Sequence, residues 1–205
     1  MTTPAPREID VSALPTIEHG PSAPLFWGQI LMICIEGTVF ALLVAAYFYL
    51  RIGFENWPLP NEKPHDWQIP TLGLFFLLAS VPPMIWAGEA SKKHDRFGTF
   101  WGTVLNLVCV VAFLICRWAE LVHLDFKWNT DVYGSLVWTF LGLHTMHACA
   151  DGVQTLVMLA ILVRKKAGEK QILGFEMDGL YWYFVVASWV PLYFLIYIYP
   201  MFSKW

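Results

Sequence analysis

The hydrophobic residues of this chain are grouped into five long runs, which short polar segments separate. A helix that crosses a bilayer needs about 20 mostly apolar residues, and each run meets that requirement. We therefore predict an all-α fold, an integral membrane bundle of five transmembrane helices that forms one domain over residues 25–205. The predicted spans cover residues 26–50, 70–90, 97–121, 133–163 and 179–202.

Prolines mark the start of the chain and two of the spans. Residues 1–24 are polar, with prolines at positions 4, 6, 15, 21 and 24, and they contain no apolar core of signal-peptide length. We predict that they form an extended arm outside the bilayer. Within the spans, the Pro82–Pro83 pair and Pro191 predict kinks, because proline removes a backbone donor.

Positive charges are concentrated in two of the loops, which predicts the orientation of the chain in the membrane. The loops after the second and fourth spans contain Lys92, Lys93, Arg96, Arg164, Lys165, Lys166 and Lys170. The opposite side contains Arg51, Lys63, Lys127 and Lys204. Since cytoplasmic loops carry an excess of Lys and Arg, we expect the N-terminus inside and the C-terminus outside.

The composition agrees with a membrane protein. Charged residues make up 14% of the chain and hydrophobic residues 57%, whereas soluble domains contain about a quarter charged residues. The net charge of −3 does not suggest a nucleic-acid partner. The cysteines form no CxxC pair, so they indicate neither structural zinc nor a disulfide framework, and we expect them to be small buried side chains. They are Cys34, Cys109, Cys116 and Cys149.

The stretch LGLHTMHACADGVQ, residues 141–154, places polar side chains inside the fourth predicted span. His144, His147, Asp151 and Gln154 are spaced three, four and three residues apart, so they lie in one stripe with an arc of roughly 80°. A metal site could use these residues. However, the sequence offers no good histidine partner for a bis-histidine haem, and six histidines are too few for a histidine-box di-iron site. We therefore interpret the stripe as interhelical hydrogen bonding, with no metal ligand.

Glu36 is the one charged residue in the first predicted span. It lies about ten residues into the helix, or roughly 15 Å from its start. A lone carboxylate at that depth is costly. We expect Glu36 either to be neutral, with a single structural hydrogen bond, or to pair with His144 or His147.

Arg117, Glu120 and Asn106 add polar side chains to the third predicted span. Arg117 and Glu120 are three residues apart, so they can form an ion pair near the outer end of this helix. Asn106 falls on the same face. We expect these residues and Gln154 to make polar contacts between helices, with a local pair that faces solvent as the alternative.

Four segments, in order along the chain, resemble the cytochrome c oxidase subunit III family. WGQILMICIEGTVFALLVAAYFYLR is similar to the family's helix with a buried glutamate, which places Glu36 at that position. RWAELVH resembles the helix that ends in a glutamate, here Glu120. DVYGSLVWTFLGLHTMHA places His144 and His147 on the family's two histidines, and YWYFVVASWVPLYFLIYIYP resembles the final helix.

The resemblance covers nearly everything from residue 26 to residue 202, with some departures. Longer members of the family have seven spans, whereas this chain is similar to the five-span bacterial form. Tyr183 stands where the family has His, Val186 where it has Asp, and Asp151 where Gly is usual. These differences indicate a divergent branch.

The resemblance implies a supporting role in a haem-copper respiratory oxidase, which transfers electrons from cytochrome c to oxygen and pumps protons. It implies that this chain holds no catalytic residue, metal or cofactor, that haem and copper belong to partner subunits, and that phospholipid binds in a cleft near Glu36. The implied partners are the catalytic subunit I, subunit II and membrane lipids, with a small extra subunit or a supercomplex also considered. The expected location is the bacterial plasma (inner) membrane. A cluster of Glu36, His144, His147 and Asp151 would support proton uptake.

Three other functions stay open at this point. The same family includes accessory subunits of quinol oxidases and of nitric oxide reductase. A small transporter or channel would need a continuous polar path, to which the second and fifth predicted spans contribute almost nothing. A redox enzyme in its own right would use the histidine stripe to bind metal.

Overall fold

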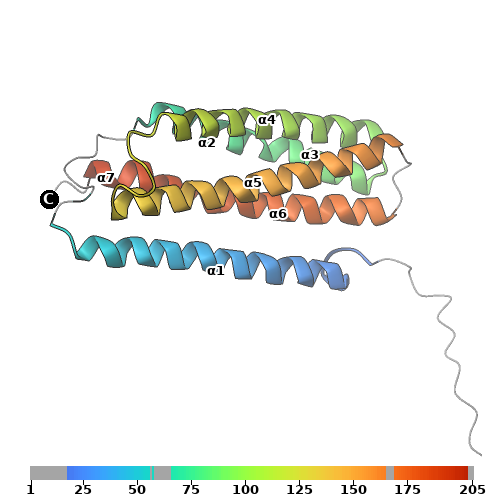
Figure 1. Cartoon of the computed structure of the whole chain (residues 1–205). Coiled ribbons are helices and arrows are strands. Elements are labelled where there is room, and N and C mark those ends of the chain that lie inside the picture. The colour runs from blue at the N-terminus through green and yellow to red at the C-terminus, as the bar shows by residue number, and fades with distance from the viewer. Residues whose placement is uncertain (1–17, 56, 58–65, 165–168, 203–205) are drawn as a thin grey trace, which may run out of the picture.

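The computed structural model describes residues 18–55, 57, 66–164 and 169–202. These residues are mostly helical (Figure 1). The elements are η1 (Gly20–Ser22), α1 (Pro24–Ile52), α2 (Gln68–Ala79), α3 (Val81–Lys92), α4 (Arg96–Val122), α5 (Val132–Arg164), α6 (Glu169–Tyr193), η2 (Phe194–Ile198) and α7 (Tyr199–Phe202). No strand occurs in these ranges, which confirms the all-α prediction. Most of the predicted N-terminal arm, residues 1–17, lies outside the described residues.

Five helical segments among the described residues are long and apolar enough to cross a membrane, as the hydrophobic runs predicted. They cover Pro24–Ile52, Gln68–Lys92, Arg96–Val122, Val132–Arg164 and Gln171–Phe202. The last segment begins well before the predicted start at residue 179. The predicted start lay too far along the chain because Glu176 and Asp178 interrupt the apolar run in the sequence. In the structure, however, Asp178 is fully buried in the bundle.

Both proline sites coincide with irregular helical geometry. Ser80 separates α2 from α3, two residues before Pro82 and Pro83. Because neither proline has an N–H to donate, two rungs of the helical hydrogen-bond ladder are missing here. Pro191 lies inside α6, and the π-helical turn η2 follows it. Turns of this wide type are rare and are frequently found at functional sites.

α6 lies at the centre of the bundle. It packs against α1, α2, α3 and α5, while α4 packs against α2, α3 and α5. α1 runs along one side of the other helices (Figure 1), where it contacts α5 and α6. Trp182, Trp189, Phe113 and Phe140 are fully buried between the helices. These large rings fill the core around the polar side chains described below.

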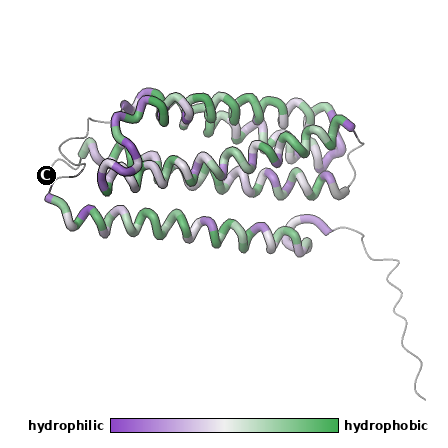
Figure 2. The backbone as a smooth tube through the Cα atoms, in the orientation of Figure 1, coloured by the Kyte–Doolittle hydropathy of each residue, from purple (hydrophilic) through white to green (hydrophobic). Residues whose placement is uncertain are grey.

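Large apolar side chains cover the outward surface of the helices, among them Leu31, Ile115 and Leu156. Figure 2 shows hydrophobic residues along the whole length of the helices and hydrophilic residues gathered at the ends of the bundle. Such a surface suits a lipid environment, because hydrocarbon does not penalise exposed apolar groups. Cys34 and Cys149 are also exposed. The expectation that all four cysteines are buried was therefore wrong, because these two lie on outward faces of α1 and α5.

Candidate functional site

Glu36 on α1 meets side chains from two other helices. Its Oε2 accepts a hydrogen bond of 2.7 Å from the Tyr181 hydroxyl on α6, and it lies 3.5 Å from Nε2 of His147 on α5. The other ring nitrogen of His147, Nδ1, lies 2.7 Å from the Leu143 carbonyl oxygen. Because a carbonyl only accepts, Nδ1 carries a hydrogen. Nε2 then faces the carboxyl group with a lone pair or a proton, so the two groups can share a proton between α1 and α5.

The sequence offered His144 and His147 as partners of Glu36, and the structure brings His147 to it but not His144. His144 is fully buried and turns toward α6, where its Nε2 lies 3.0 Å from the Val185 carbonyl oxygen. Its ring lies against Trp189, with the ring centroids 4.5 Å apart. A step of three residues rotates a side chain by about 60° around the helix. That rotation is enough for the stripe on α5 to contact α1 and α6 at once, rather than α1 alone.

Two aspartates form a second polar group between α5 and α6, which we name the carboxyl pair: Asp151 and Asp178. Oδ2 of Asp178 accepts a hydrogen bond of 2.8 Å from the Thr155 hydroxyl, whereas Gln154, the residue before Thr155, is exposed. Asp151 is 1% exposed, and neither of its carboxyl oxygens has a hydrogen-bond partner among the described residues. The two carboxyl groups are close enough to interact electrostatically.

Sequence reasoning missed Asp178 and Tyr181, which are central to both polar groups. Asp178 precedes the predicted start of the last span, so it was assigned to a loop. Tyr181 lies in a segment rich in aromatic residues, where one tyrosine does not stand out. A signal was nevertheless present, since Asp178, Tyr181 and Val185 are three and four residues apart and therefore share one helix face.

Arg117 and Glu120 on α4 form a buried ion pair. Their side chains are 2% and 4% exposed, and Nη1 of Arg117 lies 2.6 Å from Oε2 of Glu120. The Arg117 guanidinium lies 3.9 Å from the centroid of the Trp189 ring, and the Tyr197 hydroxyl in η2 donates a hydrogen bond to Glu120. Stacking and hydrogen bonding offset part of the cost of removing these charges from water. The pair predicted from the spacing is present, and the alternative of a pair that faces solvent is wrong.

Asn106 lies on the inward face of α4, about 16 Å along the helix from Arg117, so it is separate from the ion pair. It is 1% exposed, and neither its amide nitrogen nor its oxygen has a hydrogen-bond partner in the described part of the chain. Gly152 of α5 packs against Val110, because a Cβ added to Gly152 would lie 3.2 Å from Val110 Cγ1. α4 and α5 run in opposite directions, so Asn106, one turn before Val110, lies at the level of Thr155 and the carboxyl pair.

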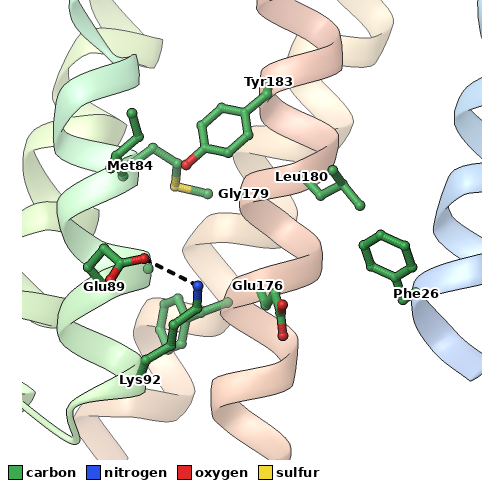
Figure 3. A pocket seen from close by; sticks show the side chains of 11 residues that line it. Phe26, Met84, Glu89, Lys92, Glu176, Gly179, Leu180 and Tyr183 are labelled. Atoms are coloured by element: carbon green, nitrogen blue, oxygen red, sulfur yellow. Dashed lines mark hydrogen bonds and ion pairs between the residues drawn. The ribbon is translucent and has the colours of Figure 1, made fainter. Parts of the chain in front are cut away.

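A cleft of about 350 Å³ opens between α1, α3 and α6 (Figure 3). Its wall is apolar and includes Phe26 and Leu180, which face one another in the figure. Its polar residues are Lys92, whose Nζ lies 3.2 Å from Oε1 of Glu89, and Glu176 of α6. The combination of an apolar wall with charged groups suits an amphiphile.

The cleft is distinct from the group formed by Glu36, His147 and Tyr181, which we name the Glu36 cluster. Glu36 is ten residues after Phe26 on α1, about 15 Å along the helix, and it is absent from the residues that line the cleft. The expectation that Glu36 lies beside the cleft therefore does not hold for this cleft. Tyr183, which stands where the family has His, does line it.

The histidines of α5 are used for contacts within the bundle. His144 and His147 each direct a ring nitrogen at a backbone carbonyl oxygen. Within the part of the chain that the structure describes, no three His, Cys, Asp or Glu side chains are grouped as a metal site would require.

Comparison with known proteins agrees with the resemblance of the motifs. A family model described as cytochrome c oxidase subunit III matches residues 17–201. Cytochrome c oxidase subunit 3 of Drosophila melanogaster is 27% identical over 179 residues, which cover 84% of this chain and 68% of that protein. The protein of the same name from Yarrowia lipolytica is 26% identical over 176 residues, 83% of this chain and 66% of that protein. The chain thus spans about two thirds of the length of these relatives.

Proposed function

Because this chain belongs to the cytochrome c oxidase subunit III family, we propose that it is the third, non-redox subunit of a haem-copper oxidase. This oxidase transfers electrons from cytochrome c to oxygen and pumps protons. The family match over residues 17–201 carries the proposal, and the five membrane-length helices agree with a multi-pass membrane protein of such a complex. Its partners are the catalytic subunit I, subunit II and membrane lipids.

The partner subunits hold the haem and copper in this proposal, and this chain supports them. Its interior polar groups join helices to one another: Glu36 joins α1 to α5 and α6, and Glu120 joins α4 to η2. Contacts of this kind fix the relative positions of membrane helices. A rigid bundle can then offer a constant surface to the catalytic subunit.

We propose that the cleft between α1, α3 and α6 binds a phospholipid. An acyl chain would lie along the apolar wall, which includes Phe26 and Leu180. Lys92 would attract the phosphate, and Glu176 would accept hydrogen bonds from an amine headgroup. A chain with Leu180→Trp should copurify with less phospholipid, because the larger ring fills the cleft.

The Glu36 cluster has the composition of a proton-sharing group, which supports a role in proton uptake. Its carboxyl, imidazole and hydroxyl groups come from three different helices, so a change of protonation alters the contacts that join them. We propose that this coupling helps the complex to keep its activity through many turnovers.

The proposed orientation places the N-terminus inside a bacterial plasma membrane and the C-terminus outside. Arg96 donates hydrogen bonds to the carbonyl oxygens of Leu162 and Val163, at 2.8 and 3.0 Å. This contact brings the end of the first basic loop beside the start of the second, at one end of the bundle. That end then has the positive charge expected of a cytoplasmic surface.

The proposal is tested by purification of the oxidase from cells that make this chain and from cells that lack it. Both preparations should contain haem, but the oxidase without this chain should lose oxygen-uptake activity sooner during turnover. A cytochrome c assay and a quinol assay on the complete complex identify the electron donor. Equal catalytic lifetimes and equal proton pumping in the two preparations would contradict the supporting role.

A further inference from the structure

The carboxyl pair lies deep in the bundle, and neither aspartate forms an ion pair among the residues that the structure describes. Asp178 is 0% exposed and Asp151 1% exposed. Residues 132–163 and 171–202, which contain both aspartates, include no Lys or Arg. Residues 97–116 of α4, which pack against α5, include none either. Arg117, the next basic residue on α4, lies about 16 Å along the helix from Asn106 and is paired with Glu120.

The other side chains around the carboxyl pair are hydroxyl, amide, imidazole and carboxyl groups, with no Lys or Arg among them. α5 contributes Thr155 and, one turn away on the other side of Asp151, His147. α6 contributes Tyr181, which interacts electrostatically with Asp151. α4 contributes Asn106 at the same level, and α1 contributes Glu36 through its bond with Tyr181.

Two ionised carboxylates are unfavourable in such a position. Burial removes the water that stabilises each charge, and the two like charges repel one another strongly in a medium of low dielectric constant. A site of this type normally takes up a proton, as carboxyl pairs that share one site do. Among the described residues, the carboxyl oxygens of Asp151 and the amide group of Asn106 have no hydrogen-bond partner. They can therefore bind a water, which needs two to four polar partners.

We propose that Asp151 and Asp178, with Asn106 of α4 at the same level of the bundle, form a site that binds a proton and the water that hydrates it. The proton leaves an Oδ of one aspartate as its bond to the water forms, and the water passes a proton to the other aspartate. No electron moves in this exchange. Asp151 also departs from the family resemblance, because it stands where Gly is usual.

The site is connected to the Glu36 cluster through α6. Asp178 and Tyr181 are one turn apart on the same face, and Tyr181 donates its hydroxyl hydrogen to Glu36. Asp151 and His147 are likewise one turn apart on α5. The two polar groups therefore lie about one helical turn apart along α5 and α6. This inference concerns the carboxyl groups of this chain and does not require the oxidase assignment.

The test is infrared spectroscopy of the full chain in lipid nanodiscs, with spectra in H₂O and D₂O compared. The wild type should show a carboxylic acid C=O band that shifts in D₂O. Asp151→Asn or Asp178→Asn should remove or move this band, whereas Asp125→Asn, a change at an exposed loop residue, should leave it in place. Circular dichroism and thermal unfolding check that each variant keeps its helices.

A second measurement avoids the need for a variant that folds. In wild-type chain with ¹³C-labelled aspartate, the acid band should move to lower frequency, because an aspartic acid produces it. An acid band that the label leaves unmoved would overturn the proposal. Carboxylate bands alone, which shift when Na⁺ or Ca²⁺ is added, would overturn it in favour of a cation site.

Discussion

The buried ion pair on α4 makes a strong prediction for the variant Glu120→Gln. Glutamine is nearly the same size and keeps an acceptor oxygen for Arg117 and Tyr197, so the main loss is the negative charge. Arg117 is then left as an unpaired cation with 2% of its side chain exposed. Breaking a buried pair from one side costs about 3–5 kcal/mol. Because Gln still accepts hydrogen bonds, we expect the free energy of unfolding to fall by an amount near the lower end of this range, about 3 kcal/mol.

The matched control lies in the same bundle. Glu89 and Lys92 on α3 form an ion pair with the same three-residue spacing, at 3.2 Å, but their side chains are 56% and 52% exposed. Exposed pairs contribute at most about 1 kcal/mol. Glu89→Gln should therefore change stability by less than about 1 kcal/mol. Each variant removes one negative charge from an ion pair. The difference between their losses of stability therefore measures the effect of burial.

The assay is unfolding of the chain in mixed micelles by titration with a denaturing detergent. Tryptophan fluorescence follows the transition, since Arg117 stacks on Trp189. The double variant Arg117→Met, Glu120→Leu removes both charges and should be more stable than Glu120→Gln, because no buried charge remains without a partner. This reasoning would be refuted if Glu120→Gln lost less than about 1 kcal/mol of stability. It would also be refuted if the double variant were less stable than Glu120→Gln.

Three further predictions follow from other parts of the structure. Glu36→Ala should leave the haem content of the complex unchanged but shorten its catalytic lifetime or lower proton pumping, and lost haem would count against the role given to Glu36. Gly102→Ala should destabilise the chain in the unfolding assay, since the new Cβ would lie 2.8 Å from the backbone nitrogen of Ala87. Gly142→Ala is the control, because nothing lies within 4 Å of its added Cβ, and equal effects would contradict the close packing of α3 and α4. Leu180→Trp should lower the phospholipid that mass spectrometry detects in the purified chain, and an unchanged lipid content would mean that the cleft holds none.

The number and type of the spans could be predicted from the sequence because hydrophobicity determines them directly. A lipid-facing helix must be apolar over its whole length, so five runs predict five helices. The start of the last span was harder, because a buried acid such as Asp178 looks like a loop residue in the sequence. The hydrogen bond that the Thr155 hydroxyl of α5 donates to Asp178 lowers the cost of placing this acid inside the bundle.

The partners of the polar residues could not be predicted with the same success. Helical periodicity placed His144 and His147 in one stripe, but it does not say which neighbouring helix each histidine faces. The same limit applies to Arg117 and Glu120, whose spacing predicted a pair but not its burial. Burial depends on Trp189 and Tyr197, which α6 and η2 bring over the pair from far along the chain. Contacts of that range depend on helix packing, which local sequence patterns do not encode.

The most direct measurement for the central claim is gentle purification from the native membrane through a tag on this chain. A reduced-minus-oxidised visible spectrum and oxygen uptake are then recorded on the same sample. The purified sample should show haem bands and cyanide-sensitive oxygen uptake, and it should contain larger partner subunits. A colourless chain that purifies alone would contradict the central claim.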